Sequence, residues 1–531
     1  MTYTIKDGCT ACDSCRPACP RQAIQLNPDA EGYWIDPTLC DGCPDLEIPA
    51  CVTACDLDQL HFLPAKKGRS KSTLLPAAIP DIFLNGKTNP FASSLVMWET
   101  CNLLTQRQGL PWQTDSEGRL CYRRPVQRGL GELRFRLAPD PTAVEVMPPS
   151  ESLAALGEFE LRAACVHLIF SAYAVTQETP WKTSFTLTSQ HFEQYLGLEK
   201  RKDLTKLEKL TLIKDLVYQT CRFRVAINWP RQGRVQGFSL AEHAVWQLMD
   251  TQYYFEQDRE GHDHLIGLSF VVQAGDWAQK FLNKQRYRQQ TAFYQYSTLP
   301  RSLLLESMSS WQQHEGAVRL LLWLLFKLRL GGDQRMTVRK LLRIAYGDAR
   351  VVEATTVRGA HKRLLKTFEN DLEALYSYGL IPLFDPDTYP VEIQPFWARV
   401  AEIPEDAEAA LDFWTEDAQQ SQSLTTSAPR DKWQRLLNAR ILSFELPEDW
   451  QQTLRQPSKR RRKRAAANQR GATLSGDDIK AARQQQSLSQ RALAQRLGKS
   501  QSWIRDVEKG RFKVNLNDQA LLQQVLAVTL G

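Results

Sequence analysis

The chain has 531 residues, several times the size of a typical domain, so we expect three or four folding units. Hydrophobic residues make up 43% of it, with 14 Trp and 21 Phe, which excludes a chain disordered over most of its length. The net charge of +7 is unevenly spread. Residues 1–60 hold 3 Lys/Arg and 10 Asp/Glu (−7), whereas residues 455–531 hold 17 and 5 (+12), and this favours a nucleic-acid partner for the C-terminal end.

Targeting and membrane signals are missing from the sequence. Residues 1–10 lack the charged and apolar regions of a secretory signal. The most apolar run, 317–330, carries three cationic side chains and is too short to cross a bilayer. We therefore expect a cytoplasmic protein with no membrane partner. Eight of the 12 cysteines lie within residues 9–55, which in a reducing compartment indicates metal binding rather than disulfides.

These eight cysteines form two groups of four. The first has the spacing C-x2-C-x2-C-x3-C and is followed by Pro20, and the second has the spacing C-x2-C-x7-C-x3-C. A C-x2-C step turns the backbone tightly enough for successive thiolates to bind corners of one iron-sulfur cubane cluster. The fourth cysteine of the group lies too far along the chain to join them, and it binds a second cluster. The spacing thus predicts two ligand sets: Cys9, Cys12, Cys15 and Cys55 for cluster 1, and Cys19, Cys40, Cys43 and Cys51 for cluster 2.

The pattern resembles the bacterial two-cluster ferredoxins over about 60 residues, and the resemblance implies two 4Fe-4S clusters and an electron donor or acceptor protein as a partner. Apolar stretches at 23–26, 33–35 and 60–63 are the expected strands around the clusters. The long second loop and Asp56, which stands where a second proline is expected, depart from the family but remove no ligand. Structural zinc would need one quartet per metal and does not explain the doubled pattern.

The middle of the chain shows alternating helical and strand patterns. After a connector and small irregular region at 65–150, we expect helices at 189–198 and 204–220 and strands at 221–228, 234–240, 252–258 and 264–272. From 315 the predicted order is a helix, a helix at 337–347, a long helix at 359–379 and a Pro-rich hairpin at 380–397.

Three helices followed by a hairpin is the order of a winged helix. Two such units, at 151–300 and 301–400, resemble plasmid replication initiators in element order alone. The second unit could bind DNA or mediate dimerisation, and the sequence leaves both open.

Nothing in the middle forms a catalytic set. His262 and His264 lie at an expected hairpin turn, where solvated histidines are a simpler interpretation than a metal site. The remaining cysteines are isolated, so we expect buried free thiols: Cys101, Cys121, Cys165 and Cys221. No Gly-rich phosphate loop occurs. We therefore expect no enzymatic activity.

A helix and a basic linker are expected at 401–473. Residues 455–470 contain eight basic and no acidic residues, including the run Arg460, Arg461, Arg462, Lys463 and Arg464. Such a run is often only a solvated linker. Beside a DNA-binding domain, we expect its side chains to release counterions from the phosphate backbone and to add affinity without sequence choice.

Residues 474–531 carry two short amphipathic helices at 489–497 and 500–508, with Ser489 and Ser500 as N-caps. Only Gly498 and Lys499 separate them, so the helices must cross steeply and need a small residue at their contact. We expect Ala494 at the contact and an apolar inner face formed by Leu493, Leu497, Ile504 and Val507.

Counted from Gln490, a small residue falls at the fifth place, Gly at the ninth, Ile at the fifteenth and Val at the eighteenth. The segment resembles the Cro-type helix-turn-helix of phage repressors over about 55 residues. This resemblance implies a phosphate anchor at Gln490 and double-stranded DNA as the partner, and it implies base contacts in the major groove by Gln501 and Ser502, with Arg505 one turn further. Lys499 and Lys509 complete the expected DNA contacts.

One such motif reads only a half-site, so we expect a homodimer. A small helical module that docks on protein is the alternative interpretation of this segment.

We thus predict a multidomain α+β protein: a two-cluster ferredoxin-like head at 1–64, a mixed winged-helix-like middle and an all-α helix-turn-helix tail at 474–531. The favoured function is a DNA-binding transcriptional regulator with a redox-responsive head. One alternative is a replication initiator or partition protein that carries the clusters, and another is an electron-transfer protein whose tail serves for docking.

Overall fold

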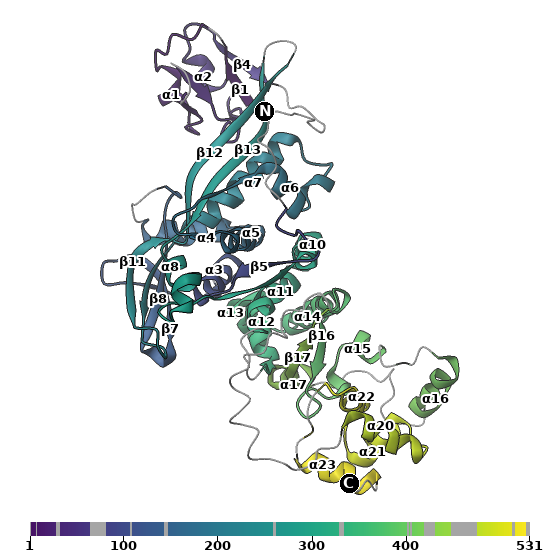
Figure 1. Ribbon diagram of the computed structural model, residues 1–531. Helices are drawn as coiled ribbons and strands as arrows, with labels where there is room; N and C mark the ends of the chain where they lie inside the picture. The colour runs from purple at the N-terminus through teal and green to yellow at the C-terminus, as the bar shows by residue number, and fades with distance from the viewer. Residues whose placement is uncertain are drawn as a thin grey trace. The chain divides into compact units, whose positions relative to one another are not determined.

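The computed structural model (Figure 1) describes the whole chain except residues 1, 7, 28–31, 64–80, 107–108, 143–146, 259–261, 329–333, 401–402, 404–405, 419–428, 430, 448–474, 512–513, 515 and 527–531. It contains two compact units, Met1–Phe326 and Lys327–Gly531. Across the described residues, no helix combines the length and apolar character that a bilayer crossing needs.

The head consists of two antiparallel strand pairs and two single-turn helices: β1 (Thr2–Ile5) with β4 (Leu60–Leu63), β2 (Ile24–Leu26) with β3 (Tyr33–Ile35), α1 (Cys15–Ala18) and α2 (Ala50–Thr53). The three strands expected from the apolar stretches are confirmed. β1, which the sequence analysis did not include, pairs with β4 and places Tyr3 and Ile5 against the core of Ile24, Ile35 and Leu60.

A five-stranded antiparallel sheet lies in the first unit, in the order β11-β10-β8-β7-β6. Its strands are β6 (Trp112–Thr114), β7 (Leu120–Val126), β8 (Gly131–Leu137), β10 (Phe223–Trp229) and β11 (Phe238–Ala244). The expectation of a small irregular region at 65–150 is wrong here, because that region supplies three of the five strands. A boundary near residue 150 therefore does not separate two folding units.

A second sheet runs in the order β12 (Trp246–Gln257), β13 (Asp263–Ala274), β9 (Phe185–Thr188). It packs against the predicted helices α6 (Ser189–Tyr195) and α7 (Lys206–Cys221) and against α5 (Arg162–Thr176), a helix buried along almost its whole length. The helices and strands predicted between 189 and 272 are confirmed as elements, although β10–β11 and β12–β13 belong to different sheets and β11 begins at Phe238.

This unit also contains the pair β5 (Thr88–Ala92) and β14 (Tyr296–Pro300), and the helices α3 (Leu95–Gln106), α4 (Pro149–Glu158), α8 (Trp277–Phe281), α9 (Lys284–Arg288), α10 (Arg301–Ser310) and α11 (Glu315–Lys327).

The second unit contains the helices α12 (Val338–Tyr346), α13 (Asp348–Thr356) and α14 (Ala360–Ser377). Its sheet has the order β15 (Met336–Thr337), β17 (Arg440–Glu445), β16 (Ile381–Phe384), and β15 directly precedes α12. The hairpin predicted at 380–397 is wrong, because β16 pairs with β17 and not with the residues directly after it. Those residues instead form a 3-10 turn and α15 (Phe396–Val400), and α16 (Ala407–Ala418) and α17 (Lys432–Asn438) precede β17.

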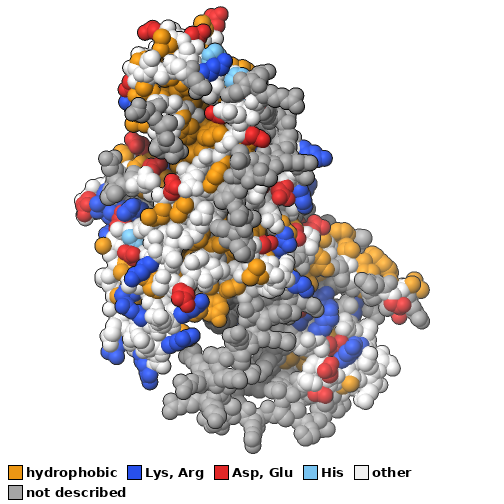
Figure 2. Space-filling view, turned by 45° about the horizontal axis from the view of Figure 1, so that its top comes forward, with side chains coloured by type: hydrophobic (Ala, Val, Ile, Leu, Met, Phe, Trp, Pro, Cys, Tyr) orange, Lys and Arg blue, Asp and Glu red, His pale blue; other side chains and the backbone are white. Residues whose placement is uncertain are grey.

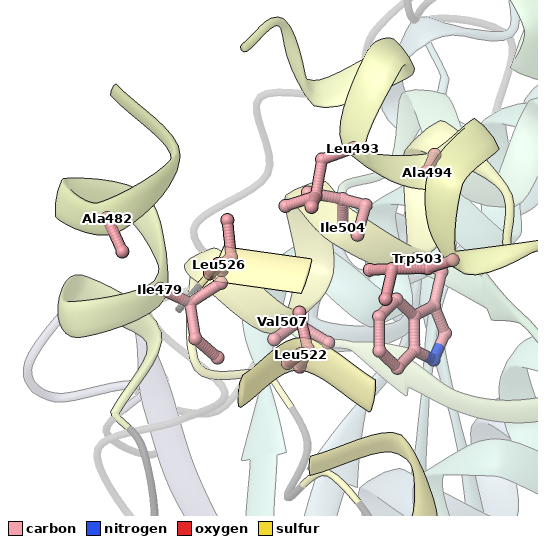
Figure 3. Packing of buried hydrophobic residues seen from close by; sticks show 10 residues of the cluster. Ile479, Ala482, Leu493, Ala494, Trp503, Ile504, Val507, Leu522 and Leu526 are labelled. Atoms are coloured by element: carbon pink, nitrogen blue, oxygen red, sulfur yellow. The ribbon is translucent and has the colours of Figure 1, made fainter. Parts of the chain in front are cut away.

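The described residues of the C-terminal segment form four helices: α20 (Gly476–Gln485), α21 (Gln490–Leu497), α22 (Gln501–Glu508) and α23 (Leu516–Leu526). The predicted inner face is confirmed, since Leu493, Ala494, Leu497, Ile504 and Val507 are all buried in one cluster (Figure 3). Trp503, Ile479 and Leu522 complete this cluster, so α20 and α23 close the core that α21 and α22 begin.

Candidate functional site

The four predicted ligands of cluster 1 face one cavity in the head. Cys9, Cys12 and Cys15 line it from the loop before α1 and its first residue, and Cys55 reaches it from the segment after α2. Burial raises the pKa of the Cys15 thiol, and the neighbouring thiols of the same quartet act in the same direction. Ile5, Leu57 and Leu60 form an apolar side of the cavity. The structure thus gathers the predicted ligands of cluster 1 around a single space.

Tight backbone turns separate these cysteines. Ala11 and Asp13 have φ values of 52° and 62°, a left-handed conformation that costs energy for side chains other than glycine. The Asp13 carboxylate accepts a hydrogen bond from Arg16 Nε at 2.6 Å, which closes the turn ahead of α1. These turns are required because three thiols only three residues apart must point to the same side.

The four predicted ligands of cluster 2 also lie near one another in the head. Burial raises the pKa of the Cys51 thiol to about 11, and the nearby thiols of Cys19, Cys40 and Cys43 add to the shift. Cys43 is also left-handed, with a φ of 50°. The backbone N–H of Ala23 points at Cys19 Sγ at 3.4 Å. The raised pKa of Cys51 means that this thiol holds its proton until a cation displaces it.

The arrangement fits an iron-sulfur cluster better than a single ion. Nowhere in the described chain do three or more His, Cys, Asp or Glu side chains converge closely enough to hold one metal ion. A tetrahedral zinc site needs such convergence. The first quartet instead surrounds a cavity, and its all-thiol donor set is the one that 4Fe-4S clusters use.

Asp36 joins the head to the rest of the first unit. Its carboxylate accepts hydrogen bonds from Lys214 Nζ at 2.6 Å and from the Tyr253 hydroxyl at 3.0 Å. The Lys214 and Asp36 side chains are only 6% and 1% exposed, so this is a buried ion pair between the head and α7. Trp34 packs edge-on against Tyr253 at 4.9 Å and against Phe255, both on β12. The sequence analysis missed this contact altogether.

Asp36 also fixes the backbone that leads to Cys40 in the second quartet. The backbone N–H of Cys40 donates to the carbonyl of Asp36 at 3.0 Å, and the Asp36 carboxylate accepts from the N–H and hydroxyl of Thr38. Thr38 in turn accepts a hydrogen bond from Lys214 at 2.8 Å. The chain that leads into Cys40 is therefore fixed by the residue that anchors the head.

The helix-turn-helix has the predicted local geometry. Ser489 and Ser500 cap α21 and α22 by accepting hydrogen bonds from the backbone N–H groups of Ala492 and Trp503, at 3.0 and 3.1 Å. Gly498, with a φ of 64°, ends α21 in a left-handed conformation and lets the chain turn at once into α22. Of the expected DNA contacts on this part, Lys509 is exposed, whereas Gln501, Ser502 and Arg505 are half-buried.

Four of the expected DNA contacts have partners inside the domain. Arg505 Nε lies 3.3 Å from the Asp506 carboxylate, and the Ser502 hydroxyl lies 3.0 Å from that of Ser500. Gln490 donates to the Glu508 carboxylate at 2.7 Å, and Glu508 is also paired with Arg483 at 2.5 Å in a buried ion pair. Lys499 lies over the ring of Trp503 and within 3.3 Å of Asp518. The basic run Arg460, Arg461, Arg462, Lys463 and Arg464 lies outside the described residues.

The expectation that His262 and His264 are solvated is wrong. His264 Nε2 lies 2.7 Å from Asp258, and His262 Nδ1 lies 3.5 Å from the same carboxylate. Both side chains are largely buried, with 16% and 12% of their surface exposed, and they share the Asp258 carboxylate at the end of the β12–β13 hairpin.

The four isolated cysteines are buried free thiols, as expected. Burial raises the pKa of Cys165 to about 12, and burial also raises the pKa values of Cys101 and Cys221. Such thiols are protonated and unreactive at neutral pH.

Comparison with known proteins supports the resemblances stated for the N-terminal and the C-terminal segment. A helix-turn-helix family model matches residues 479–531. The N-terminal segment is 39% identical over 59 residues to Ferredoxin-2 of Chlorobaculum tepidum, which covers 11% of this chain and 92% of that protein. The N-terminal segment belongs to the ferredoxin family. The chain is thus a fusion of a ferredoxin domain with a Cro/C1-type helix-turn-helix domain.

Two further relatives match the ferredoxin domain. An uncharacterized ferredoxin-like protein of Haemophilus influenzae is 38% identical over 58 residues, 11% of this chain and 65% of that protein. A ferredoxin-like protein in the vnf region of Azotobacter chroococcum is 40% identical over 50 residues, 9% of this chain and 74% of that protein. Each of these matches covers 9–11% of this chain.

Proposed function

We propose that this protein is a sequence-specific DNA-binding transcriptional regulator, not an enzyme, whose ferredoxin domain holds two 4Fe-4S clusters and makes DNA binding depend on their state. The observation that carries the proposal is the presence, in one chain, of two gathered cysteine quartets and a capped helix-turn-helix. Because one motif reads a half-site, we propose a homodimer as the DNA-binding form.

The residues proposed to hold the clusters are Cys9, Cys12, Cys15 and Cys55 for the first and Cys19, Cys40, Cys43 and Cys51 for the second. Bound clusters would supply one-electron redox chemistry at a potential set by hydrogen bonds and exposure. The protein's own contribution is to position the thiols through left-handed turns and to exclude water on the apolar side of the cavity.

A regulator of this kind needs a physical connection between the head and the other domains. Asp36 supports this requirement, because it holds the backbone leading to Cys40 and also pairs with Lys214 on α7. A rearrangement around the second quartet would disturb a buried charge pair, and such pairs tolerate disturbance poorly. We propose that this connection carries the state of the head into the first unit.

The number and pairing of clusters can be tested with cysteine variants and iron analysis of anaerobically purified protein. We expect about eight iron atoms per chain. If Cys19 serves the second cluster, the double variant Cys19→Ser/Cys51→Ser should keep about four iron atoms, whereas Cys19→Ser/Cys9→Ser should lose nearly all of them. Equal iron contents in the two double variants would contradict the crossed assignment.

The regulatory part is tested by titrating genomic binding sites, found by mapping bound DNA, with cluster-loaded and cluster-free protein at fixed salt. We expect different affinities or footprints for the two forms. Identical binding would remove the redox switch but leave the DNA-binding regulator in place. Sites clustered as repeats at a replication origin, with none at promoters, would contradict transcriptional regulation.

A further inference from the structure

A cluster of cationic side chains lies in the first unit, far along the chain from the helix-turn-helix. It comprises exposed Lys and Arg residues of three segments: Arg128 at the β7–β8 tip, Arg231 and Arg234 at the β10–β11 tip, and Lys284, Arg286 and Arg288 on α9. We call this set the hairpin-tip surface. Figure 2 shows Lys and Arg side chains gathered at the lower left of the view, where Figure 1 places the ends of β7, β8 and β11.

Contacts between the three segments show that they are neighbours. The Arg234 guanidinium donates a hydrogen bond to the Gln290 side chain, just after α9. At Gly131, next to the β7–β8 tip, an added Cβ would lie 2.4 Å from the Asn228 carbonyl oxygen, so only glycine permits this approach of the two hairpins. The Trp229 ring packs on Phe281 at 5.0 Å, which fixes the base of the second hairpin to α8.

The charge of these segments is one-sided. Residues 118–131, 216–241 and 277–305 contain 13 Lys and Arg and not one Asp or Glu. None of the six residues of the hairpin-tip surface forms an ion pair with any described residue. The nearest carboxylate along the β7–β8 hairpin is Glu132, and it lies 4.0 Å from Arg123.

A charge of one sign across several segments is unusual for a surface that contacts only water. Soluble proteins mix both signs of charge on their surfaces, and a one-signed patch stores repulsion between its members. Elsewhere in the first unit, Arg201 pairs with Asp203 and Arg119 pairs with Glu117. The hairpin-tip surface also presents an exposed Tyr287 between Arg286 and Arg288. A polyanion is the partner that such a surface fits.

We propose that the hairpin-tip surface is a second DNA-binding surface, which contacts the phosphate backbone of the duplex whose sequence the helix-turn-helix reads. This inference rests on the proposed function, since it takes duplex DNA as the ligand of the chain. The contacts are electrostatic and independent of sequence, because cations at hairpin tips meet phosphates rather than base edges. Two surfaces on one chain then share one ligand, and each raises the effective concentration of DNA at the other.

The experiment uses the full chain with four substitutions, Arg231→Gln, Arg234→Gln, Arg286→Gln and Arg288→Gln. All four side chains are exposed, so the fold should persist, and circular dichroism and thermal unfolding check this. Affinity for a random-sequence duplex should fall at least tenfold at 0.1–0.15 M salt. The slope of log K against log salt should become shallower by about 3 to 4, since each lost phosphate contact removes about 0.9.

A matched control removes the same net charge elsewhere in the first unit, with Lys6→Gln, Lys182→Gln, Lys200→Gln and Lys202→Gln, which are also exposed. The control should bind with nearly unchanged affinity and slope. A second variant replaces the same four arginines by lysine and should keep most of the affinity, because the charges remain.

Three results would overturn the inference. They are an unchanged slope in the glutamine variant, an equal loss in the control, and a loss seen with single-stranded DNA or RNA but not with duplex. Failure of the proposed function looks different, because the unaltered protein would then bind no duplex at all. If instead Gln501→Ala abolishes sequence preference while the glutamine variant alone changes the slope, both proposals stand.

Discussion

The buried pair between Asp36 and Lys214 offers the sharpest test of how the head is held. Replacing Lys214 by Met keeps the length of the side chain and removes its charge. The Asp36 carboxylate, 1% exposed, then keeps only the hydroxyls of Thr38 and Tyr253 and the Thr38 N–H as donors. We expect the head to lose its attachment to α7 in a measurable fraction of molecules.

The expected cost follows from the burial of both groups. Removing one partner of a buried ion pair typically costs about 3–5 kcal/mol, because the remaining charge is left uncompensated in a poorly hydrated site. The pair also supports Trp34, which contacts Tyr253 and Phe255, so the aromatic contact should loosen along with it. Replacing both residues, with Asp36→Asn and Lys214→Met together, should cost less than the sum of the single changes by about 2–3 kcal/mol.

Hydrogen exchange measured peptide by peptide is the suitable assay, because a multidomain chain has no single unfolding free energy. Peptides from 33–40 and from 206–221 should exchange faster in Lys214→Met, while peptides from the helix-turn-helix should not change. The control is Lys206→Met on the same helix, which breaks a half-buried pair with Glu193 at 2.5 Å that does not involve the head. Unchanged protection at 33–40, or strictly additive single changes, would refute the reasoning.

Three further predictions concern other parts of the chain. His167 is fully buried, accepts from Trp246 at 2.9 Å and has its pKa lowered by burial to about 4, so its stabilising contribution is complete above pH 6.5 and is lost as the pH falls toward 4. The free energy of local opening, measured by hydrogen exchange of peptides from 162–176 at pH 7 and 5, should fall by about 2 kcal/mol in the unaltered protein and by less in His167→Gln. Glu508→Gln should destabilise the helix-turn-helix by about 3–5 kcal/mol, because it leaves the Arg483 guanidinium buried without its counter-charge. Hydrogen exchange of peptides from 476–508 measures this loss. Unchanged protection of these peptides would count against a structural role for the pair. Gln501→Ala and Arg505→Ala should each reduce discrimination for the mapped site by about 1–3 kcal/mol in competition binding while iron content stays constant, and a loss of iron instead would show that the changes act on folding.

Local patterns were sufficient where the structure depends on neighbours in sequence. Three strands of the head, β2, β3 and β4, follow from the apolar pattern within a few residues. The helices α21 and α22 of the tail follow from their spacing, apolar period and serine caps. The buried positions of Leu493 and Ile504 follow from the same period. Whether the two quartets bind clusters as assigned remains a prediction, although the structure gathers each set.

Pairings between distant segments were not visible in the same way. β5 pairs with β14 across more than 200 residues, and β8 pairs with β10 although 85 residues separate their ends. The predicted hairpin at 380–397 failed for this reason, because the real partner of β16 begins at Arg440 and a Pro-rich segment nearby offered a plausible turn. A local pattern specifies that a strand exists and which face is buried, but it does not specify the neighbour.

The contact that joins the head to α7 did leave a trace in the sequence. Along α7, Leu210, Ile213 and Val217 mark the buried stripe of the helix, and Lys214 falls inside that stripe at i+4 from Leu210. A lysine on a buried stripe needs an acidic partner, because an unpaired buried ammonium is too costly. The first 60 residues carry an excess of acids, and among their described acids Asp36 is the one recorded as buried. A search for the partner of Lys214 would therefore have led to the acidic head. A charged residue on the buried stripe of a helix thus indicates a contact with another domain, and hydrophobic periodicity by itself does not detect it.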